Sequence, residues 1–277
     1  MALNTALAGK VYPSRTYEVT AEAIRKYARA TNEKNPMFLG DDPIAPPAFP
    51  IVPAAESLRE AMQDEELGVD MAMLVHAEEE HVLYAPIAAG DVLEVKPTLA
   101  AVEAKETGHT FTLKVELKTQ KGKPVADVLS TMFIRKTGSG ARPAKDQKKE
   151  PTFILQKPQQ IDEDQSSRYA EASGDDNPIH VDPEFARNRA RLPGIILQGM
   201  CTMAFAARAV LDGVGGGDPT RLKRIRVRFS RPVFPGETIT TRVWRLDDEG
   251  TRSVFGFDTV NPSGAVVIKD GLAEISF

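Results

Sequence analysis

Two segments of the chain, one near residue 27 and one near residue 169, repeat one another without a gap. Three aligned pairs and one aligned dipeptide carry the match: Tyr27 with Tyr169, Ala28 with Ala170, Ala30 with Ala172, and Asn35-Pro36 with Asn177-Pro178. A second ungapped match joins residues 86–91 to residues 232–237. The repeated unit covers about half of the chain, which is the size of an ordinary domain and far larger than a solenoid repeat. The sequence therefore predicts two similar domains in tandem, at 1–137 and 152–277.

Residues 138–151, between the two repeats, form a polar and charged stretch whose only apolar side chains are those of alanine and proline. Such a composition is typical of an exposed linker between domains. Its lysines also suggest nucleic-acid binding, but the chain has a net charge of −4, and nucleic-acid binding requires a basic surface. We therefore expect a solvated linker and no nucleic-acid partner.

The cysteine content and the hydropathy pattern favour a reducing, aqueous compartment. Cys201 is the only cysteine, which excludes an intramolecular disulfide. No apolar run approaches the roughly 20 residues of a membrane span. Residues 1–10 are too short and too weakly apolar for a signal peptide. We expect a cytoplasmic protein without a membrane span.

Each half of the chain contains one apolar helix followed by strand-like runs. A helix opened by the cap residue Thr20 is predicted at 20–30. The apolar helices are predicted at 53–67 and 199–211. The strand-like runs lie at 72–84, 91–103, 109–118, 124–135, 221–230, 237–247, 251–260 and 264–276. This order predicts an α+β fold in which an antiparallel sheet wraps around one helix in each half.

A further short helix is predicted at 161–172, just before the second copy of the repeated dipeptide. Three acids, Asp162, Glu163 and Asp164, are expected in its first turn, where they suit the helix dipole. Gly174 is expected to end this helix. The chain therefore leaves the helix through a sharp turn at Gly174.

The loop after this turn carries a carboxylate and an imidazole. Asn177 precedes a proline and is pushed towards an extended conformation. The next helix is predicted to begin at Asp182-Pro183, with a cap residue followed by proline at the first helical position. Asp175 and His180 thus share one rigid loop, and this pairing of side chains suits general acid–base catalysis.

The sequence Gly174-Asp175-x-Asn177-Pro178-Ile179-His180 is preceded by Tyr169-Ala170 and followed by x-Asp182. This pattern resembles the signature of the (R)-specific enoyl-CoA hydratases, which are the MaoC-like dehydratases of the hotdog superfamily. The resemblance implies two tandem hotdog domains with a catalytic C-terminal domain, and it places the catalytic pair on Asp175 and His180. It implies no metal and no other cofactor, although carboxylates beside one imidazole would also suit a metal ion.

Hydration of a 2-enoyl thioester requires a water for attack at C3, a proton for C2 and stabilisation of the thioester oxygen. Asp175 and His180 can share one water and meet the first two needs. The third can be met at the start of the helix that begins at Gly199, where backbone N–H groups lack partners and glycine allows close approach. Family members often carry histidine before this glycine, whereas this chain carries Gln198. We place Gln198 and Asn177 among the supporting residues.

The first half lacks the acid–base pair at the aligned positions. Glu33 stands where the second half has Asp175, and Phe38 stands where it has His180. Because a phenylalanine cannot transfer protons, we predict a catalytically silent first half. The three remaining histidines lie outside the motif and are interpreted as surface or packing residues: His76, His81 and His109.

Residues 41–53 are rich in proline and show little helix or strand pattern. Proline removes backbone donors, so this segment could lie against an apolar cavity without leaving N–H groups orphaned. We hypothesise that it shapes an acyl pocket with Phe38, Phe49 and Ile51. The alternative is that the segment merely covers the first helix.

The run from 221 to 229 alternates with a period of two, so that its arginines share one face of a strand. Four arginines of this region could hold the phosphates of coenzyme A or an acidic carrier protein: Arg224, Arg226, Arg228 and Arg231. A solvated sheet face explains the same pattern equally well.

The sequence thus predicts a hydro-lyase that adds water reversibly to trans-2-enoyl-CoA in fatty-acyl metabolism. Its (R)-3-hydroxyacyl product is implied by the resemblance alone. The alternatives are a 3-hydroxyacyl dehydratase acting on acyl carrier protein, a hotdog thioesterase and a non-catalytic acyl-binding subunit. The intact pair of Asp175 and His180 disfavours the last of these. The expected partner is an acyl-CoA or a carrier-bound thioester, and a homodimer of the duplicated chain stays open.

Overall fold

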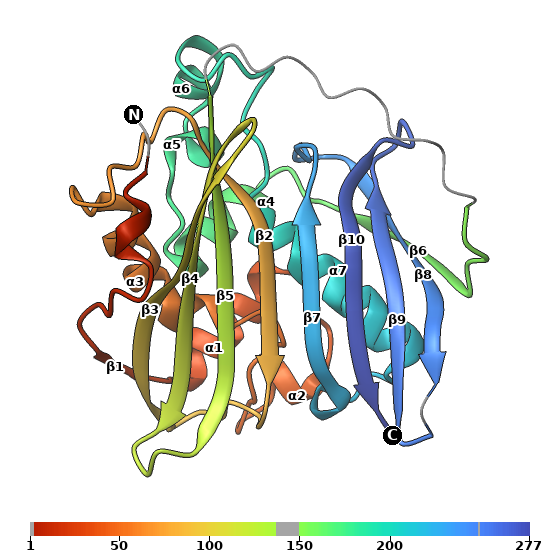
Figure 1. Cartoon of the computed structure of the whole chain (residues 1–277). Helices are drawn as coiled ribbons and strands as arrows, with labels where there is room; N and C mark the ends of the chain where they lie inside the picture. Colours follow the sequence, from red (N-terminus) through yellow and green to blue (C-terminus); the bar gives the residue numbers. More distant parts are fainter. Residues whose placement is uncertain (1–2, 137–149, 249) are drawn as a thin grey trace.

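The computed structural model describes residues 3–136, 150–248 and 250–277, so that residues 138–149 of the expected linker lie outside the described residues. The described strands form one ten-stranded antiparallel sheet, and the larger helices lie against one face of it (Figure 1). The predicted α+β class is confirmed, with both halves of the chain joined in a single sheet.

All eight predicted strands are present. The strands are β1 (Arg15–Glu18), β2 (Leu74–Leu83), β3 (Val92–Lys105), β4 (Gly108–Thr119), β5 (Pro124–Arg135), β6 (Leu155–Gln160), β7 (Leu222–Phe229), β8 (Thr238–Asp248), β9 (Arg252–Val260) and β10 (Val266–Ser276). The two strands that the sequence did not predict, β1 and β6, are short and lie at the edges of the sheet. Strand β6 even contains Pro158, which an edge strand tolerates because one side of its backbone needs no ladder partner.

The strand order displays the sequence repeat directly. The order is β1-β3-β4-β5-β2-β7-β10-β9-β8-β6. Counted outwards from the centre, β2, β5, β4, β3 and β1 in one half correspond to β7, β10, β9, β8 and β6 in the other. The halves meet where β2 pairs antiparallel with β7, with Glu79 opposite Val227. The duplication is therefore visible in the topology as a pseudo-two-fold arrangement.

The helices also follow the repeat. They are α1 (Ala21–Ala30), α2 (Pro36–Leu39), α3 (Ile51–Gln63), α4 (Gln165–Ser173), α5 (Pro178–Val181), α6 (Pro183–Asn188) and α7 (Gly199–Val214). The two long helices, α3 and α7, are the apolar helices that the sequence predicted. Thr20 caps α1 as expected, because its hydroxyl oxygen accepts a hydrogen bond from the Ala23 N–H at 3.0 Å. None of the described helices is long and apolar enough to cross a membrane.

Helix α4 begins at Gln165, later than the predicted start at residue 161. The prediction that acids fill its first turn was therefore wrong. Asp162 lies before the helix, where its carboxylate accepts hydrogen bonds from Arg168 and from Asn32 of the first half. The contact with Asn32 ties the two halves together.

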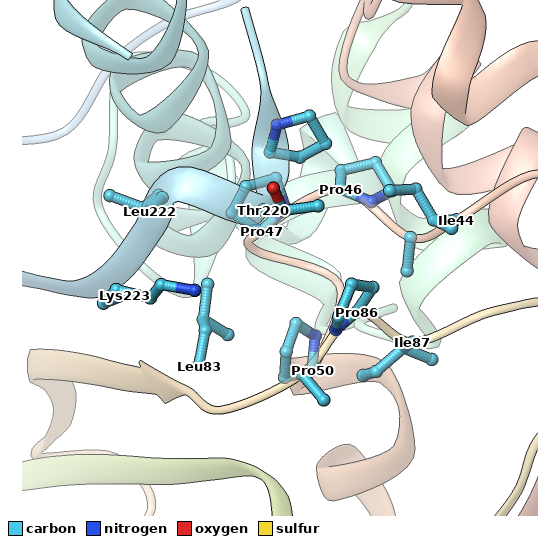
Figure 2. Close-up of a pocket in the computed structure, with 13 residues that line it drawn as sticks. Ile44, Pro46, Pro47, Pro50, Leu83, Pro86, Ile87, Thr220, Leu222 and Lys223 are labelled. Atoms are coloured by element: carbon cyan, nitrogen blue, oxygen red, sulfur yellow. The ribbon is translucent and has the colours of Figure 1, made fainter. Parts of the chain in front are cut away.

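Phe38, Phe49 and Ile51 are buried in the core of the first half, with Phe38 and Phe49 fully inaccessible to solvent. The Phe49 ring meets the Tyr27 ring edge-on, with centroids 5.5 Å apart. A small pocket of about 40 Å³ lies beside the proline-rich segment, but none of these three side chains lines it (Figure 2). This burial favours the alternative in which the segment covers the first helix.

Replacing Phe49 by alanine should therefore destabilise the protein. Removing a fully buried phenylalanine side chain costs about 3–5 kcal/mol, and urea unfolding measures this loss directly. The Met37→Ala variant is the control, because Met37 is exposed and its loss should change the free energy of unfolding by less than about 0.5 kcal/mol. Equal stability of Phe49→Ala and the wild-type protein would show that Phe49 does not belong to the core.

Candidate active site

His180 is a buried histidine whose protonation pattern is fixed by its surroundings. It lies on the short helix α5, whose start is capped by the side-chain oxygen of Asn177, an acceptor for the Ile179 N–H at 3.3 Å. The Nδ1 atom of His180 is 2.7 Å from the carbonyl oxygen of Ile196. A carbonyl oxygen can only accept, so Nδ1 carries a hydrogen and donates. In the neutral ring, Nε2 is then left free to accept a proton.

The carboxylate of Asp175 lies opposite this free nitrogen. The distance between Nε2 of His180 and Oδ2 of Asp175 is 4.0 Å. This separation is too long for a direct hydrogen bond but allows one water molecule to contact both atoms. The Asp175 side chain is 44% exposed, whereas that of His180 is 9% exposed. The pair therefore forms a site open to solvent on the carboxylate side and closed behind the imidazole.

Two side chains from different helices hold the backbone of the loop on which Asp175 lies. Gly174 ends α4 in the left-handed conformation, with φ 78°. Its carbonyl oxygen accepts a hydrogen bond at 2.9 Å from Nη2 of Arg59, which lies on α3 of the first half. The next carbonyl, that of Asp175, accepts one at 3.1 Å from the side-chain amide of Gln198. The first half thus binds one carbonyl of the loop through Arg59, and the second half binds the next carbonyl through Gln198.

Gln198 is fully buried and also donates to the carbonyl oxygen of Ser166 at 3.0 Å. These two hydrogen bonds fit the expectation that Gln198 is a supporting residue. Arg59, by contrast, was not singled out from the sequence. The sequence contains one sign that Arg59 belongs to the repeat: Arg59 and Arg208 each lie nine residues before a glycine, Gly68 and Gly217. In the structure both glycines have positive φ.

The start of α7 meets the same loop. The first helical hydrogen bond runs from the Thr202 N–H to the Gln198 carbonyl. Within the described residues, the N–H groups at 199–201 have no acceptor, and Gln198 gives no side-chain cap. A Cβ atom at Gly199 would approach the Phe229 ring to 3.2 Å, so packing as well as access favours glycine here. The helix N-terminus thus offers free donors for an anionic oxygen.

The corresponding place in the first half is closed. Phe38 occupies the His180 position and is buried, while Pro50 and Pro53 remove two N–H groups from the start of α3. The side-chain amide of Asn35 donates to the carbonyl of Gly217 at 2.7 Å and fastens this loop to the end of α7. The first half therefore lacks the imidazole and two of the N–H groups at the start of its long helix.

Glu33, at the Asp175 position, is buried, and its carboxyl group has no hydrogen-bond partner among the described residues. Burial raises its pKa to about 7, although the guanidinium group of Arg208 acts in the opposite direction. Arg208 itself donates to the carbonyl oxygens of Thr31 and Asn32, which mirrors the contact of Arg59 with Gly174. Glu33 is thus a carboxyl group in a closed and partly apolar environment.

Another buried carboxylate, Glu79, lies at the seam between β2 and β7. It accepts hydrogen bonds from Nε2 of His76 and from Nε2 of His81, each at 2.9 Å. Burial alone would raise the pKa of Glu79, but the two histidines together hold it below its usual value. The packing interpretation of these two histidines therefore matches their positions. No group of three or more metal-ligating side chains among the described residues could hold a metal ion.

The arginines of β7 lie on the sheet face opposite to Ile225 and Val227, which are buried. Arg224 pairs with Glu80 at 2.7 Å and with Glu274 at 3.4 Å. Arg228 pairs with Glu78 at 3.5 Å. These carboxylates already neutralise two of the four arginines, which favours the solvated-face interpretation over phosphate binding.

The raised pKa of Glu33 gives a prediction for stability. Between pH 4.5 and about 7 the folded protein holds a proton on Glu33 that the unfolded chain releases. The contribution of Glu33 to the free energy of unfolding is therefore largest below pH 4.5 and is lost as the pH rises to about 7. Relative to Glu33→Gln, the wild-type protein should lose on the order of 2–3 kcal/mol between pH 5 and 8 in urea unfolding. Glu65→Gln, at an exposed position, is the control and should lose the same free energy of unfolding as the wild type over this pH range. The prediction fails if Glu33→Gln shows that loss too.

Comparison with known proteins identifies the family of this chain. The family model described as MaoC like domain matches residues 145–262, and the model described as FAS1-like, dehydratase domain region matches residues 6–128. The 3-hydroxyacyl-thioester dehydratase Y of Mycobacterium tuberculosis is 35% identical over 216 residues, which are 73% of each chain. The probable enoyl-CoA hydratase 2 of Dictyostelium discoideum is 33% identical over 215 residues, which are 74% of this chain and 71% of that protein.

The structural comparison covers both halves of the chain. The solved MaoC-like dehydratase from Phytophthora capsici superimposes with a TM-score of 0.79 and 28% identity, over 99% of this chain and 97% of that one. The fold is a tandem double hotdog, as the sequence resemblance implied. The chain belongs to the MaoC-like dehydratase family.

Proposed function

We propose that this protein hydrates trans-2-enoyl-CoA reversibly to (R)-3-hydroxyacyl-CoA. The observation that carries the proposal is the separation of 4.0 Å between Nε2 of His180 and Oδ2 of Asp175, beside the free N–H groups of α7. The names of the relatives, an enoyl-CoA hydratase and a 3-hydroxyacyl-thioester dehydratase, support the same chemistry.

Water lies between Asp175 and His180 in this mechanism. The water oxygen forms a bond to C3 of the substrate, while the pair accepts one of its protons. A proton from the same pair reaches C2, so that the elements of one water are added across the double bond. The hydrogen bond from Nδ1 to Ile196 keeps the imidazole in the tautomer whose Nε2 can accept a proton.

The thioester oxygen gains negative charge as C2 becomes enolate-like. The N–H of Gly199 and the dipole of α7 stabilise this charge at the helix N-terminus. The held carbonyls of Gly174 and Asp175 keep the acid–base pair in place relative to that terminus. The (R) configuration of the product follows from family membership.

Hydration and dehydration use the same groups in opposite directions. The relative from Mycobacterium tuberculosis, which is named as a dehydratase, therefore suggests a second candidate: removal of water from a 3-hydroxyacyl group on a carrier protein. Assays with CoA-linked and carrier-linked substrates distinguish these two candidates.

Asp175→Asn and His180→Gln should each lower kcat for crotonyl-CoA by a factor on the order of 10² or more, because each removes a group that moves a proton. The loss of enoyl-thioester absorbance measures turnover, and circular dichroism verifies the fold. Asp176→Asn is the matched control, since exposed Asp176 makes no hydrogen bond or ion pair with any described residue. Near-normal turnover in either of the first two variants would remove that residue from the mechanism.

Arg59→Gln should lower kcat by roughly tenfold with little change in KM, because a loop displaced by a fraction of an ångström misplaces Asp175. Arg208→Gln, which removes the equivalent contact at the silent loop, should leave kcat unchanged. A rise in KM without a fall in kcat in Arg59→Gln would instead show that Arg59 contacts the substrate.

A further inference from the structure

The segment 182–196 leaves the catalytic histidine and returns to it. It begins at Asp182, two residues after His180, continues through α6, and ends at Ile196. There the Ile196 N–H donates to the Ile179 carbonyl at 3.2 Å, while the Ile196 carbonyl accepts the hydrogen bond from His180. Both ends of this segment are therefore anchored at the short helix that carries His180.

A stretch of five residues inside this segment contains three arginines, and all three are exposed: Arg187, Arg189 and Arg191. None of them forms an ion pair with a carboxylate of the described residues. The only side-chain hydrogen bond they make within that part of the chain runs from Nε of Arg187 to the Pro193 carbonyl, at 3.4 Å. These three residues, called here the α6 arginine cluster, present guanidinium groups whose charge is not neutralised.

The two acids of the segment are already engaged at its other end. Asp182 caps α6 by accepting from the N–H groups of Glu184 and Phe185. The carboxylate of Glu184 accepts from the side chain of Asn188 at 2.8 Å. Neither carboxylate forms an ion pair with an arginine of the α6 arginine cluster, which therefore keeps its positive charge on a chain of net charge −4.

Several arginines elsewhere are neutralised by carboxylates, although Arg226 and Arg231 form no ion pair with a described residue. Arg224 and Arg228 of β7 pair with Glu80 and Glu78, as described above. Arg242 pairs with Asp258 at 2.6 Å. The α6 arginine cluster thus fits a phosphate ligand better than Arg224 and Arg228 do, because its charge is free and its segment ends at Ile196, the hydrogen-bond partner of His180.

We propose that the α6 arginine cluster binds the phosphate groups of the coenzyme A part of the substrate. Guanidinium forks match phosphate oxygens with two parallel hydrogen bonds. The flexible pantetheine arm of coenzyme A joins these phosphates to the thioester, which then lies between Gly199 and the catalytic pair. This inference rests on the proposed function and names the part of the substrate that the site recognises.

A carrier protein is the less suitable occupant. The cluster is confined to five residues, which suits a compact phosphate ligand, and the negative net charge of the chain disfavours docking of an acidic protein. Carrier-linked substrate is therefore included in the test as a separate arm.

The test compares two thioesters of the same acyl group, crotonyl-CoA and crotonyl-pantetheine, of which only the first carries phosphate. For the triple variant Arg187→Gln, Arg189→Gln, Arg191→Gln, KM for crotonyl-CoA should rise by at least about tenfold with kcat nearly unchanged. Its kinetic constants for crotonyl-pantetheine should equal those of the wild type. Adenosine 3′,5′-bisphosphate should bind the wild type in calorimetry, more weakly as salt is raised, and should bind the variant at least tenfold more weakly.

The matched control removes three positive charges elsewhere. Lys118→Gln, Lys121→Gln and Lys123→Gln change the β4–β5 turn, which Figure 1 shows at the opposite end of the molecule from α6. This control should keep the wild-type KM for crotonyl-CoA.

Three results would overturn the proposal: an unchanged KM for crotonyl-CoA in the α6 variant, an equal rise for both thioesters, or a rise only when Arg224, Arg226 and Arg228 are replaced instead. Loss of activity of the α6 variant towards carrier-linked crotonate alone would assign the cluster to a carrier protein and would also refute it. Failure of the proposed function looks different, because the wild-type protein would then hydrate neither thioester.

Discussion

The pairing of β2 with β7 is the interaction on which the rest of the structure depends. It joins two five-stranded halves into one sheet and leaves neither half with an open edge at the centre. Glu79, held between His76 and His81, places a fully satisfied carboxylate at this seam. Because the seam fixes α3 relative to α4, Arg59 of the first half can reach the carbonyl of Gly174 in the second.

The duplication has produced one open site and one closed site on the same scaffold. Each half keeps the asparagine–proline start of a short helix, after α1 in the first half and after α4 in the second. In the first half, however, a phenylalanine takes the place of the histidine, and prolines take the place of helix donors. Glu33 remains as a buried carboxyl group without a proton-transfer partner, and Arg208 holds its loop. The first half contributes packing and the contact from Arg59.

The chemistry proposed for the second half depends on groups that have few alternative arrangements. The Ile196 carbonyl selects one tautomer of His180, and Gln198 fixes the backbone of Asp175. The same Ile196 closes the base of the segment that carries the α6 arginine cluster. The acid–base pair, the helix N-terminus and the proposed phosphate-binding surface are thus connected through a short stretch of backbone.

The sequence by itself determined the duplicated α+β architecture, because burial periodicity, cap residues and turn residues act over a few neighbouring positions. It also placed Asp175 and His180 close together, since glycine and the asparagine–proline pair restrict the local backbone, but it did not reveal that His180 lies on the short helix α5. It did not reveal the edge strands β1 and β6, which bury too few side chains to show a clear pattern. Only the tertiary structure decided which tautomer His180 adopts, where Arg59 donates and which arginines are neutralised. The reason is distance along the chain: Arg59 meets its acceptor 115 residues away, and Arg224 meets Glu80 144 residues away.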